Sequence, residues 1–342
     1  MPSAGAPGRK PVWILGSLLQ FLAVTLIGLS AITLTGVAAG WAIIIFLTLF
    51  SLARGLCSVS AKDLVGKTIP KTRRGRLGGL SASLSGLLAA ALGIWMLMRG
   101  DQDASPRFYA GLLAAAGCLW LLAALIFTRL REEPGETAGG GNAFREALSR
   151  LDLLRSDAVF RRFLLTRALL LCTALSAPYY VLLARSHTDA DLGLLGTFII
   201  AGGLAATLSA PIWGLLADTS SRRVLITGAT IASLLGVALF GLVNWLPTLA
   251  SQPWRYPPAF FVLAVSHSGV RAGRKTYLVD MAGGVKRLDY VAVSNSLIGL
   301  ILLLVGLFSG AVSFLPPEGM ILMLSGFGLA GAFLGRSLPE VQ

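Results

Sequence analysis

Long apolar runs dominate this chain and restrict what it can fold into. A helix that crosses the roughly 30 Å hydrocarbon core of a bilayer needs about 20 consecutive apolar residues. Ten runs of about that length, separated by polar loops, cover residues 13–34, 38–59, 77–98, 108–130, 163–183, 192–217, 224–246, 258–277, 291–314 and 320–334. Only 13% of all residues are charged, whereas about a quarter are charged in soluble domains. We therefore predict an all-α integral membrane protein with about ten transmembrane helices.

The eighth run is the least certain span, because a charge interrupts it. It is continuously apolar only over residues 258–270, and Arg271 follows. Thirteen residues of helix at 1.5 Å per residue are about 20 Å long. A helix of this kind can cross the membrane when its charged side chain faces the protein interior or extends to the cytoplasmic surface.

The Lys and Arg residues are unequally distributed between the two sides of the predicted membrane. When loops are assigned alternately to two sides, all but four of the 29 fall on the side of the N-terminus. The four exceptions are Arg99, Arg107, Arg185 and Arg255. Basic loops stay in the cytoplasm, so we expect a multi-pass cell-membrane protein with both termini cytoplasmic, in a bacterial inner membrane. The net charge of +13 does not indicate nucleic-acid binding, because no folded basic domain carries it.

No sequence feature indicates an enzyme or a metal centre. The sequence has no nucleotide-binding glycine loop, no cluster of metal ligands and no extramembrane domain able to hold an active site. Cys57, Cys118 and Cys172 fall in separate predicted helices, where we expect them to pack as small apolar side chains. We expect no cofactor and no metal.

A polar segment, residues 131–162, separates the first four predicted helices from the last six. Its opening EEPGETAGGGN is typical of a flexible linker. Phe144, Leu148, Leu151 and Leu154 then recur at helical spacing between charged residues. This pattern predicts an amphipathic helix at the membrane surface.

The two parts of the chain contain an internal repeat. Residues 54–63 and 271–280 each begin with Arg and end with Asp, at the end of a predicted helix. Further matches are Ser81-Ala82-Ser83 then Gly86 with Ser294-Asn295-Ser296 then Gly299, and Lys10 then Gly16 with Arg222 then Gly228. Both copies place Arg and Asp on the cytoplasmic side, so the repeats run parallel about an axis along the membrane normal. The first four helices thus correspond to the last four, and residues 163–217 have no counterpart.

The loop between the sixth and seventh helices carries a recognisable motif, Gly214-Leu-Leu-Ala-Asp218-Thr-Ser-Ser-Arg222-Arg223. It resembles the signature of the major facilitator superfamily, which has a Gly, three residues, an Asp and a basic turn ending in paired Arg. Thr219 and Ser221 depart from that signature, because they replace a basic residue and a Gly. Gly8-Arg9-Lys10 resembles the end of the same motif in the first half of the family.

The resemblance implies pseudo-two-fold bundles of six helices, of which this sequence contains four and six. Residues 1–130 would be an incomplete N-terminal half, equivalent to family helices 3–6. Residues 131–162 would be the cytoplasmic linker, and residues 163–342 the C-terminal half.

In the family the motif loop acts as a latch between conformations. This role implies a conformational gate at Gly214, Asp218, Arg222 and Arg223. Gly214 would permit close helix packing, Asp218 would accept hydrogen bonds at helix ends, and the Arg pair would anchor at anionic headgroups. The alternative is that these residues only end helices and fix the topology.

Four charged residues related by the repeat form a second candidate group. We predict a cytoplasmic charge network of Arg54, Asp63, Arg271 and Asp280, because charges within a span are costly and often functional. In the alternative interpretation, the two arginines extend to the membrane surface as topology anchors.

Five further polar residues are candidates for a substrate cavity. Arg167, Tyr179 and Tyr180 lie on the fifth helix, which in the family lines that cavity, and His267 and Asn295 lie on the eighth and ninth. His267 could relay protons or could be a packed, hydrogen-bonded histidine. The tyrosines could instead be interfacial anchors, and Asn295 could serve helix packing.

We interpret the chain as a secondary active or facilitative transporter that moves a small solute by alternating access. The expected partners are the lipid bilayer and an unidentified small-molecule substrate, with no nucleic acid, and we expect a monomer. A buried carboxylate titrates near neutral pH, but none lies in the middle of a predicted span, so proton coupling is left open.

Two other interpretations are left open by the sequence. A ten-helix drug/metabolite-type carrier matches the helix count, although its five-plus-five repeats have opposite orientations. A non-transporting membrane protein, such as a receptor, an assembly factor or an inactive truncated product, is the second, because an incomplete first half would lack one side of the substrate path.

Overall fold

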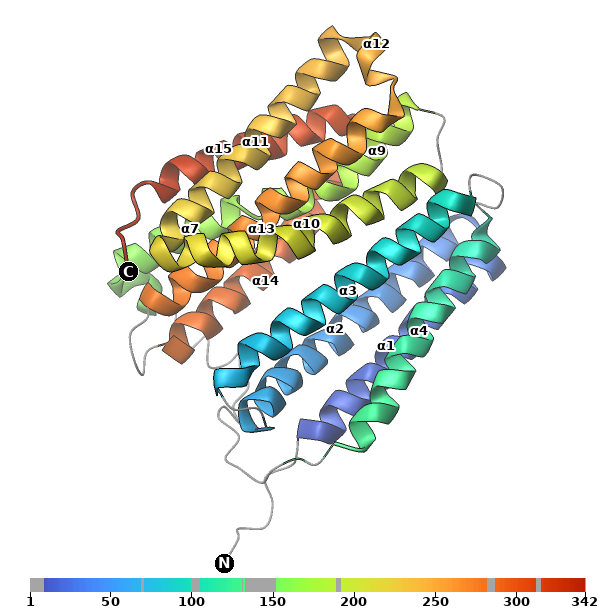
Figure 1. Cartoon of the computed structure of the whole chain (residues 1–342), viewed down its shortest axis with the longest axis horizontal. Coiled ribbons are helices and arrows are strands. Elements are labelled where there is room, and N and C mark those ends of the chain that lie inside the picture. Colours follow the sequence, from blue (N-terminus) through green and yellow to red (C-terminus); the bar gives the residue numbers. More distant parts are fainter. Residues whose placement is uncertain are drawn as a thin grey trace, which may run out of the picture. The chain divides into compact units, whose positions relative to one another are not determined.

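The chain folds into helices throughout the part that is described. A computed structural model describes residues 9–68, 71–99, 105–130, 132, 152–188, 192–281, 287–311 and 315–341. Every element in these ranges is a helix, so the predicted all-α class is confirmed (Figure 1). The elements are α1 (Arg9–Thr33), α2 (Gly36–Thr68), α3 (Lys71–Arg99), α4 (Pro106–Thr128), α6 (Asp152–Ser156), α7 (Ala158–Leu169), α8 (Cys172–Leu175), α9 (Ala177–His187), α10 (Leu192–Thr219), α11 (Ser221–Trp245), α12 (Pro247–Ala250), the 3-10 turn η1 (Pro253–Arg255), α13 (Tyr256–Met281), α14 (Arg287–Ala311) and α15 (Pro317–Gly335).

All ten predicted spans fall on helices, most of which are long and apolar enough to cross a membrane. Six described stretches are long and apolar enough to cross a membrane, and one of them, Gly193–Trp245, contains both α10 and α11. Two shorter apolar helices, Leu84–Met98 and Val293–Val305, lie within α3 and α14. α13 is not among these stretches, because His267 and Arg271 interrupt its apolar sequence. This helix is the eighth span, the one that Arg271 made uncertain.

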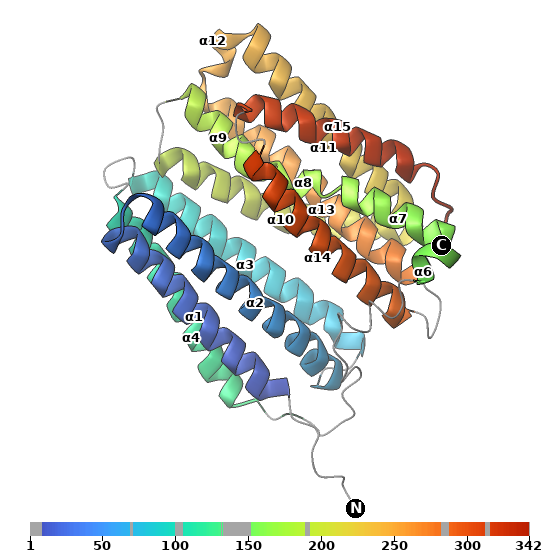
Figure 2. The ribbon, with the colours of Figure 1, turned by 180° about the vertical axis from the view of Figure 1, so that it is seen from behind.

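The helices form two compact units, each described here by itself. The first comprises residues 1–81 and 102–140. Within it α1 packs against both α2 and α4 (Figures 1 and 2). Gly16 allows the approach to α2, since an added Cβ would lie 3.0 Å from the carbonyl oxygen of Ala53. Gly28 allows the approach to α4, where its Cβ would lie 3.2 Å from the Cα of Ala110.

The second unit comprises residues 82–101 and 141–342. α11 packs against α13 and α15, α13 also contacts α10, and α15 contacts α7, α8 and α9 (Figure 2). An added Cβ on Gly228 would lie 2.7 Å from the Ser266 carbonyl oxygen, which shows how closely α11 approaches α13. One helix flanked by two therefore occurs in both units, and the sequence repeat pairs α1 with α11, α2 with α13 and α4 with α15.

Large apolar side chains cover the outer surface of both units. Val37, Trp41, Leu215 and Phe333 are all more than 60% exposed. Apolar patches of this extent are rare on soluble monomers, whereas a lipid environment solvates them without cost. The surface composition thus agrees with a multi-pass membrane protein.

The predicted amphipathic helix of the linker is only partly covered by the structure. Phe144, Leu148 and Leu151 lie outside the described residues. Leu153 and Leu154 in α6 pack against the buried cluster around Phe160. Two leucines of the described part thus pack on the protein, and the position of the segment at the membrane surface stays a prediction.

Candidate functional site

The fifth predicted span keeps a helical backbone over residues 158–187 but has two irregular turns, at Leu170–Leu171 and at Ser176. α7 ends at Leu169, α8 covers only Cys172–Leu175, and α9 begins at Ala177. Pro178 has no N–H to continue the helix bonding, and the Ser176 hydroxyl donates to the Cys172 carbonyl at 2.8 Å.

Arg167 and Asn295, two of the predicted cavity residues, are in direct contact. The Arg167 Nη2 donates to the Asn295 amide oxygen at 3.0 Å, and its Nη1 donates to the Ser294 hydroxyl. The Arg167 Nε is buried and has no hydrogen-bond partner among the described residues. The half-buried Arg167 cation therefore links α7 to α14 through two neutral side chains.

His267 is also linked to the α7–α9 span. Its Nδ1 lies 3.0 Å from the Thr173 hydroxyl, which donates in turn to the Leu170 carbonyl. This contact joins α13 to α8. Both hydrogen-bonded pairs, Arg167 with Asn295 and His267 with Thr173, thus connect this span to a neighbouring helix.

The two predicted tyrosines lie in different environments. Tyr180 is 1% exposed in the core with Leu183, Leu263 and Ile321, and its hydroxyl has no hydrogen-bond partner among the described residues. Tyr179 instead lines a cavity of about 790 Å³. The structure therefore separates these neighbours, and only Tyr179 is available to a ligand.

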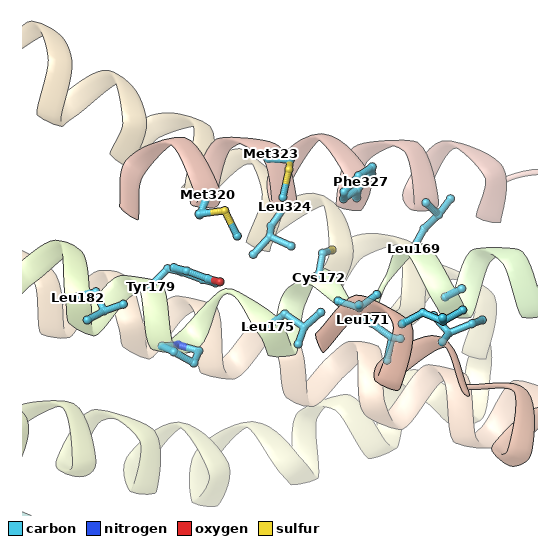
Figure 3. Close-up of a pocket in the computed structure, with 15 residues that line it drawn as sticks. Leu169, Leu171, Cys172, Leu175, Tyr179, Leu182, Met320, Met323, Leu324 and Phe327 are labelled. Atoms are coloured by element: carbon cyan, nitrogen blue, oxygen red, sulfur yellow. The ribbon is translucent and has the colours of Figure 1, made fainter. Parts of the chain in front are cut away.

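The cavity beside Tyr179 is almost entirely apolar (Figure 3). Met320 and Leu324 of α15 face Cys172 and Tyr179 across it. Its volume is within the range of small-molecule sites, about 300–1,000 Å³. Ligand pockets combine an apolar lining with a few polar groups, and here those groups are the Tyr179 hydroxyl and the Cys172 thiol.

The α10–α11 motif loop finds its ionic partner outside the motif. Arg222 forms an ion pair of 2.9 Å with Glu340, and Arg223 lies 3.8 Å from the same carboxylate. The Ser220 hydroxyl caps α11 and lies 3.0 Å from Glu340. Asp218, the expected acceptor, is exposed and makes no hydrogen bond or ion pair with described residues.

The chain after α15 is fixed to this end of the second unit, which we call the basic end. The Leu338 carbonyl accepts a hydrogen bond of 2.7 Å from Arg222, and the Pro339 carbonyl accepts one of 3.0 Å from the Tyr277 hydroxyl. Gly214 of α10 is not at a close helix contact, because an added Cβ would meet no atom within 4 Å. Of the four motif residues, the structure brings together only the two arginines.

A second glutamate has the same role in the first unit. The Glu132 carboxylate accepts the backbone N–H groups of Arg9 and Lys10 at 2.9 and 3.0 Å, at the start of α1. An anion is favoured there by the helix dipole. Glu132 and Glu340 were missed in the sequence, although both follow the last helix of a repeat and lie near a proline. That shared position was the sequence signal that could have identified both glutamates.

The predicted charge network of Arg54, Asp63, Arg271 and Asp280 has members in both units and stays a prediction. Arg54 and Arg271 are exposed, and neither forms an ion pair with a described carboxylate. The side chain of Asp63 lies outside the described part of the structure. Arg274, which the sequence analysis did not select, is half-buried and interacts electrostatically with Arg167, His267 and Arg271.

Comparisons with known proteins identify the family of this chain. The profile of the Major Facilitator Superfamily matches residues 6–284. The uncharacterized proteins Rv2209 of Mycobacterium tuberculosis and Mb2232 of Mycobacterium bovis are 22% identical over 296 residues, covering 84% of this chain and 54% of each relative. The chain thus spans about half the length of the curated relatives it matches.

Solved structures share the fold at low sequence identity. A D-xylose–proton symporter superposes with a TM-score of 0.72 over 98% of this chain and 82% of that one, at 14% identity. The transporter FucP, in its outward conformation, gives 0.56 over 97% and 83%, also at 14% identity. These similarities show the arrangement of helices and leave the substrate to be argued from this chain's own residues.

Proposed function

Because the chain belongs to the major facilitator superfamily, a family of membrane transporters, we propose that it moves a small solute across the membrane by alternating access. The observation that carries this proposal is the set of polar contacts made by the α7–α9 span, from Arg167 to Asn295 and from Thr173 to His267, which reach two neighbouring helices. Polar groups within a span mark solute pathways. Membership in the family excludes the ten-helix drug/metabolite-type alternative.

We place the basic end in the cytoplasm of a bacterial inner membrane, with both termini on that side. The excess of Lys and Arg in the corresponding loops supports this orientation. The Arg222–Glu340 ion pair is then the cytoplasmic contact that a gate must break and remake. Transport is secondary active or facilitative and requires no cofactor.

Flux in liposomes tests the proposal. Purified protein would be reconstituted and uptake measured for labelled D-xylose and labelled benzoate, one neutral and one anionic solute. We expect protein-dependent uptake that falls in Glu340→Gln and in Asp218→Asn. Equal fluxes with and without protein for both solutes would contradict the proposal for this chain.

A further inference from the structure

Three arginines of the second unit, Arg167, Arg271 and Arg274, form no ion pair with a carboxylate of the described residues. Arg271 and Arg274 follow His267 at i+4 and i+7, so the three share one face of α13. Arg274 interacts electrostatically with Arg167 of α7, and Arg271 with Arg274. None of the three arginines forms an ion pair in the described part of the chain.

The groups that do contact this cluster are all neutral. Arg167 donates to Ser294 and Asn295, while its Nε is buried without a partner. A charge in a poorly hydrated site needs an opposite charge or several hydrogen bonds to offset its lost hydration. Neutral oxygens meet this need only in part, and mutual repulsion of the arginines adds to the cost.

Two glutamates elsewhere in the chain meet basic side chains or a helix N-terminus. Glu340 pairs with Arg222, and Glu132 accepts the first N–H groups of α1. Arg167 therefore differs from Arg222 and Arg223, because no acid among the described residues pairs with it. What the cluster lacks is an anion.

We propose that Arg167 and Arg274, assisted by Arg271, bind an anionic group, the carboxylate or phosphate of the transported solute. The guanidinium plane donates two parallel hydrogen bonds to either group. A phosphate of an anionic lipid headgroup has the same chemistry, and the test below separates the two sources. Transport of this anion rests on the proposed function, whereas its binding can be measured without flux.

Thermal unfolding of the full chain in a neutral detergent tests the site. Samples would contain sodium phosphate, sodium benzoate or sodium chloride at equal ionic strength, or added phosphatidylglycerol. A ligand at ten times its Kd stabilises the folded state, and we expect phosphate or benzoate to raise Tm by about 2 °C or more over chloride. Arg167→Gln and Arg274→Gln should lose this shift, whereas Arg336→Gln, at the exposed position that follows α15, should keep it.

A second readout separates an anion site from a structural arginine. In sodium chloride without phosphate, benzoate or phosphatidylglycerol, Arg167→Gln should have a Tm equal to or above that of the unchanged chain, because the substitution removes repulsion from Arg274. A lower Tm in chloride would show that the protein already neutralises Arg167, and the proposal would be wrong. Equal Tm values in all salts and with phosphatidylglycerol would overturn it as well.

The remaining outcomes assign the ligand and separate this inference from the transport proposal. A shift with phosphatidylglycerol alone would support the anion site and identify a lipid headgroup as its ligand, in place of a solute. A shift with benzoate or phosphate and no flux of labelled benzoate would support the site and contradict transport. Flux of D-xylose without any anion-dependent shift would contradict the site and support transport.

Discussion

Glu340 holds the motif arginines from beyond the last helix, while the motif's own Asp218 makes no ionic contact in the described structure. A partly exposed ion pair contributes up to about 1 kcal/mol, and the contact with the Ser220 hydroxyl adds to it. The carboxylate matters because it binds both the α11 N-terminus and the chain that follows α15.

Replacing Glu340 by Gln should therefore lower Tm by about 1–4 °C, given about 2–4 °C per kcal/mol for a unit of this size. Asp218→Asn is the matched comparison, since it removes one carboxylate from the same loop. We expect its Tm to stay within error of the unchanged chain. A larger drop for Asp218→Asn than for Glu340→Gln would restore Asp218 as the structural partner of the motif.

The buried hydroxyl of Tyr180 tests whether this atom contributes to stability or to flux. Its hydroxyl is buried in an apolar core and has no hydrogen-bond partner among the described residues. Burying an unsatisfied hydroxyl costs about 1–3 kcal/mol, so Tyr180→Phe should leave Tm unchanged or raise it, and should leave flux unchanged. Tyr179→Phe, which removes a hydroxyl from the cavity, is the comparison. A fall in Tm for Tyr180→Phe would reveal a partner for this hydroxyl.

At the scale of elements, α3 and α10 meet through paired glycines. An added Cβ on Gly93 would lie 2.7 Å from the Gly196 carbonyl oxygen, and one on Gly196 would lie 2.7 Å from the Gly93 carbonyl oxygen. Gly86, seven residues before Gly93, and Gly203, seven residues after Gly196, form a second close approach, where an added Cβ on Gly203 would lie 3.0 Å from the Gly86 carbonyl oxygen. Small residues at this spacing let two helix backbones come together without side chains between them.

Gly196→Ala should therefore force the two backbones apart. Overpacking costs about 1–3 kcal/mol, and we expect Tm to fall by several degrees. Gly326→Ala is the control, because its Cβ would meet nothing within 4 Å. Ala is favoured over Gly in a helix by about 1 kcal/mol, so this variant should have a raised Tm. The same direction of change in both variants would contradict close packing at Gly196.

The start of α7 is joined to the start of α14 by one strong hydrogen bond. The Tyr290 hydroxyl donates to the Asp157 carboxylate at 2.6 Å, while the same carboxylate caps α7 through Val159 and Phe160. Burial and the hydrogen bond to Asp157 raise the pKa of Tyr290 to about 12. A tyrosine with a raised pKa contributes its full stability below the unfolded pKa of about 10, and this contribution is lost as pH rises through about 12.

Tyr290→Phe should lower Tm by about 3 °C or more, since a hydrogen bond to a charged group contributes about 1.5–3 kcal/mol. The deficit should be equal at pH 6 and pH 9, and it should shrink above about pH 10. Thermal unfolding of both proteins across this range measures it. A deficit that disappears between pH 6 and pH 9 would mean that another group controls the contact.

The elements that the sequence predicted best are those whose signal is local. Run length alone located the helices, because lipid requires each span to satisfy its own backbone. The irregular turn at Leu170 and Leu171 was not predicted, because no Pro or Gly marks it. It coincides with a side-chain hydrogen bond, from Thr173 to the Leu170 carbonyl, and with a tertiary contact to His267.

For the whole molecule, the sequence predicted several residues of the candidate site but not the residues that they contact. Arg167, His267 and Asn295 were selected because polar groups in a span are costly. Their partners Thr173 and Ser294 are ordinary helix residues whose role follows only from packing. Glu340 was missed for the same reason, since nothing in its local sequence shows that the C-terminal segment returns to the start of α11.

The charged residues in the spans predict which gradient, membrane potential or pH, drives transport by the whole protein. The described spans hold arginines that remain protonated at every physiological pH, and no carboxylate lies in the middle of a predicted span. If an anion binds at Arg167 and crosses alone, its movement carries charge and responds to membrane potential. A potential of 100 mV supplies about 2.3 kcal/mol per charge, which corresponds to about 50-fold accumulation.

Labelled benzoate in proteoliposomes tests this prediction directly. A potassium diffusion potential, positive inside, should drive accumulation at equal pH on both sides, whereas a pH gradient at zero potential should drive no more than protein-free liposomes show. Arg167→Gln should abolish the response to potential, and Arg336→Gln should retain it. Accumulation that follows the pH gradient and ignores the potential would instead mean that a proton moves with the solute, with His267 in α13 as the group to substitute next.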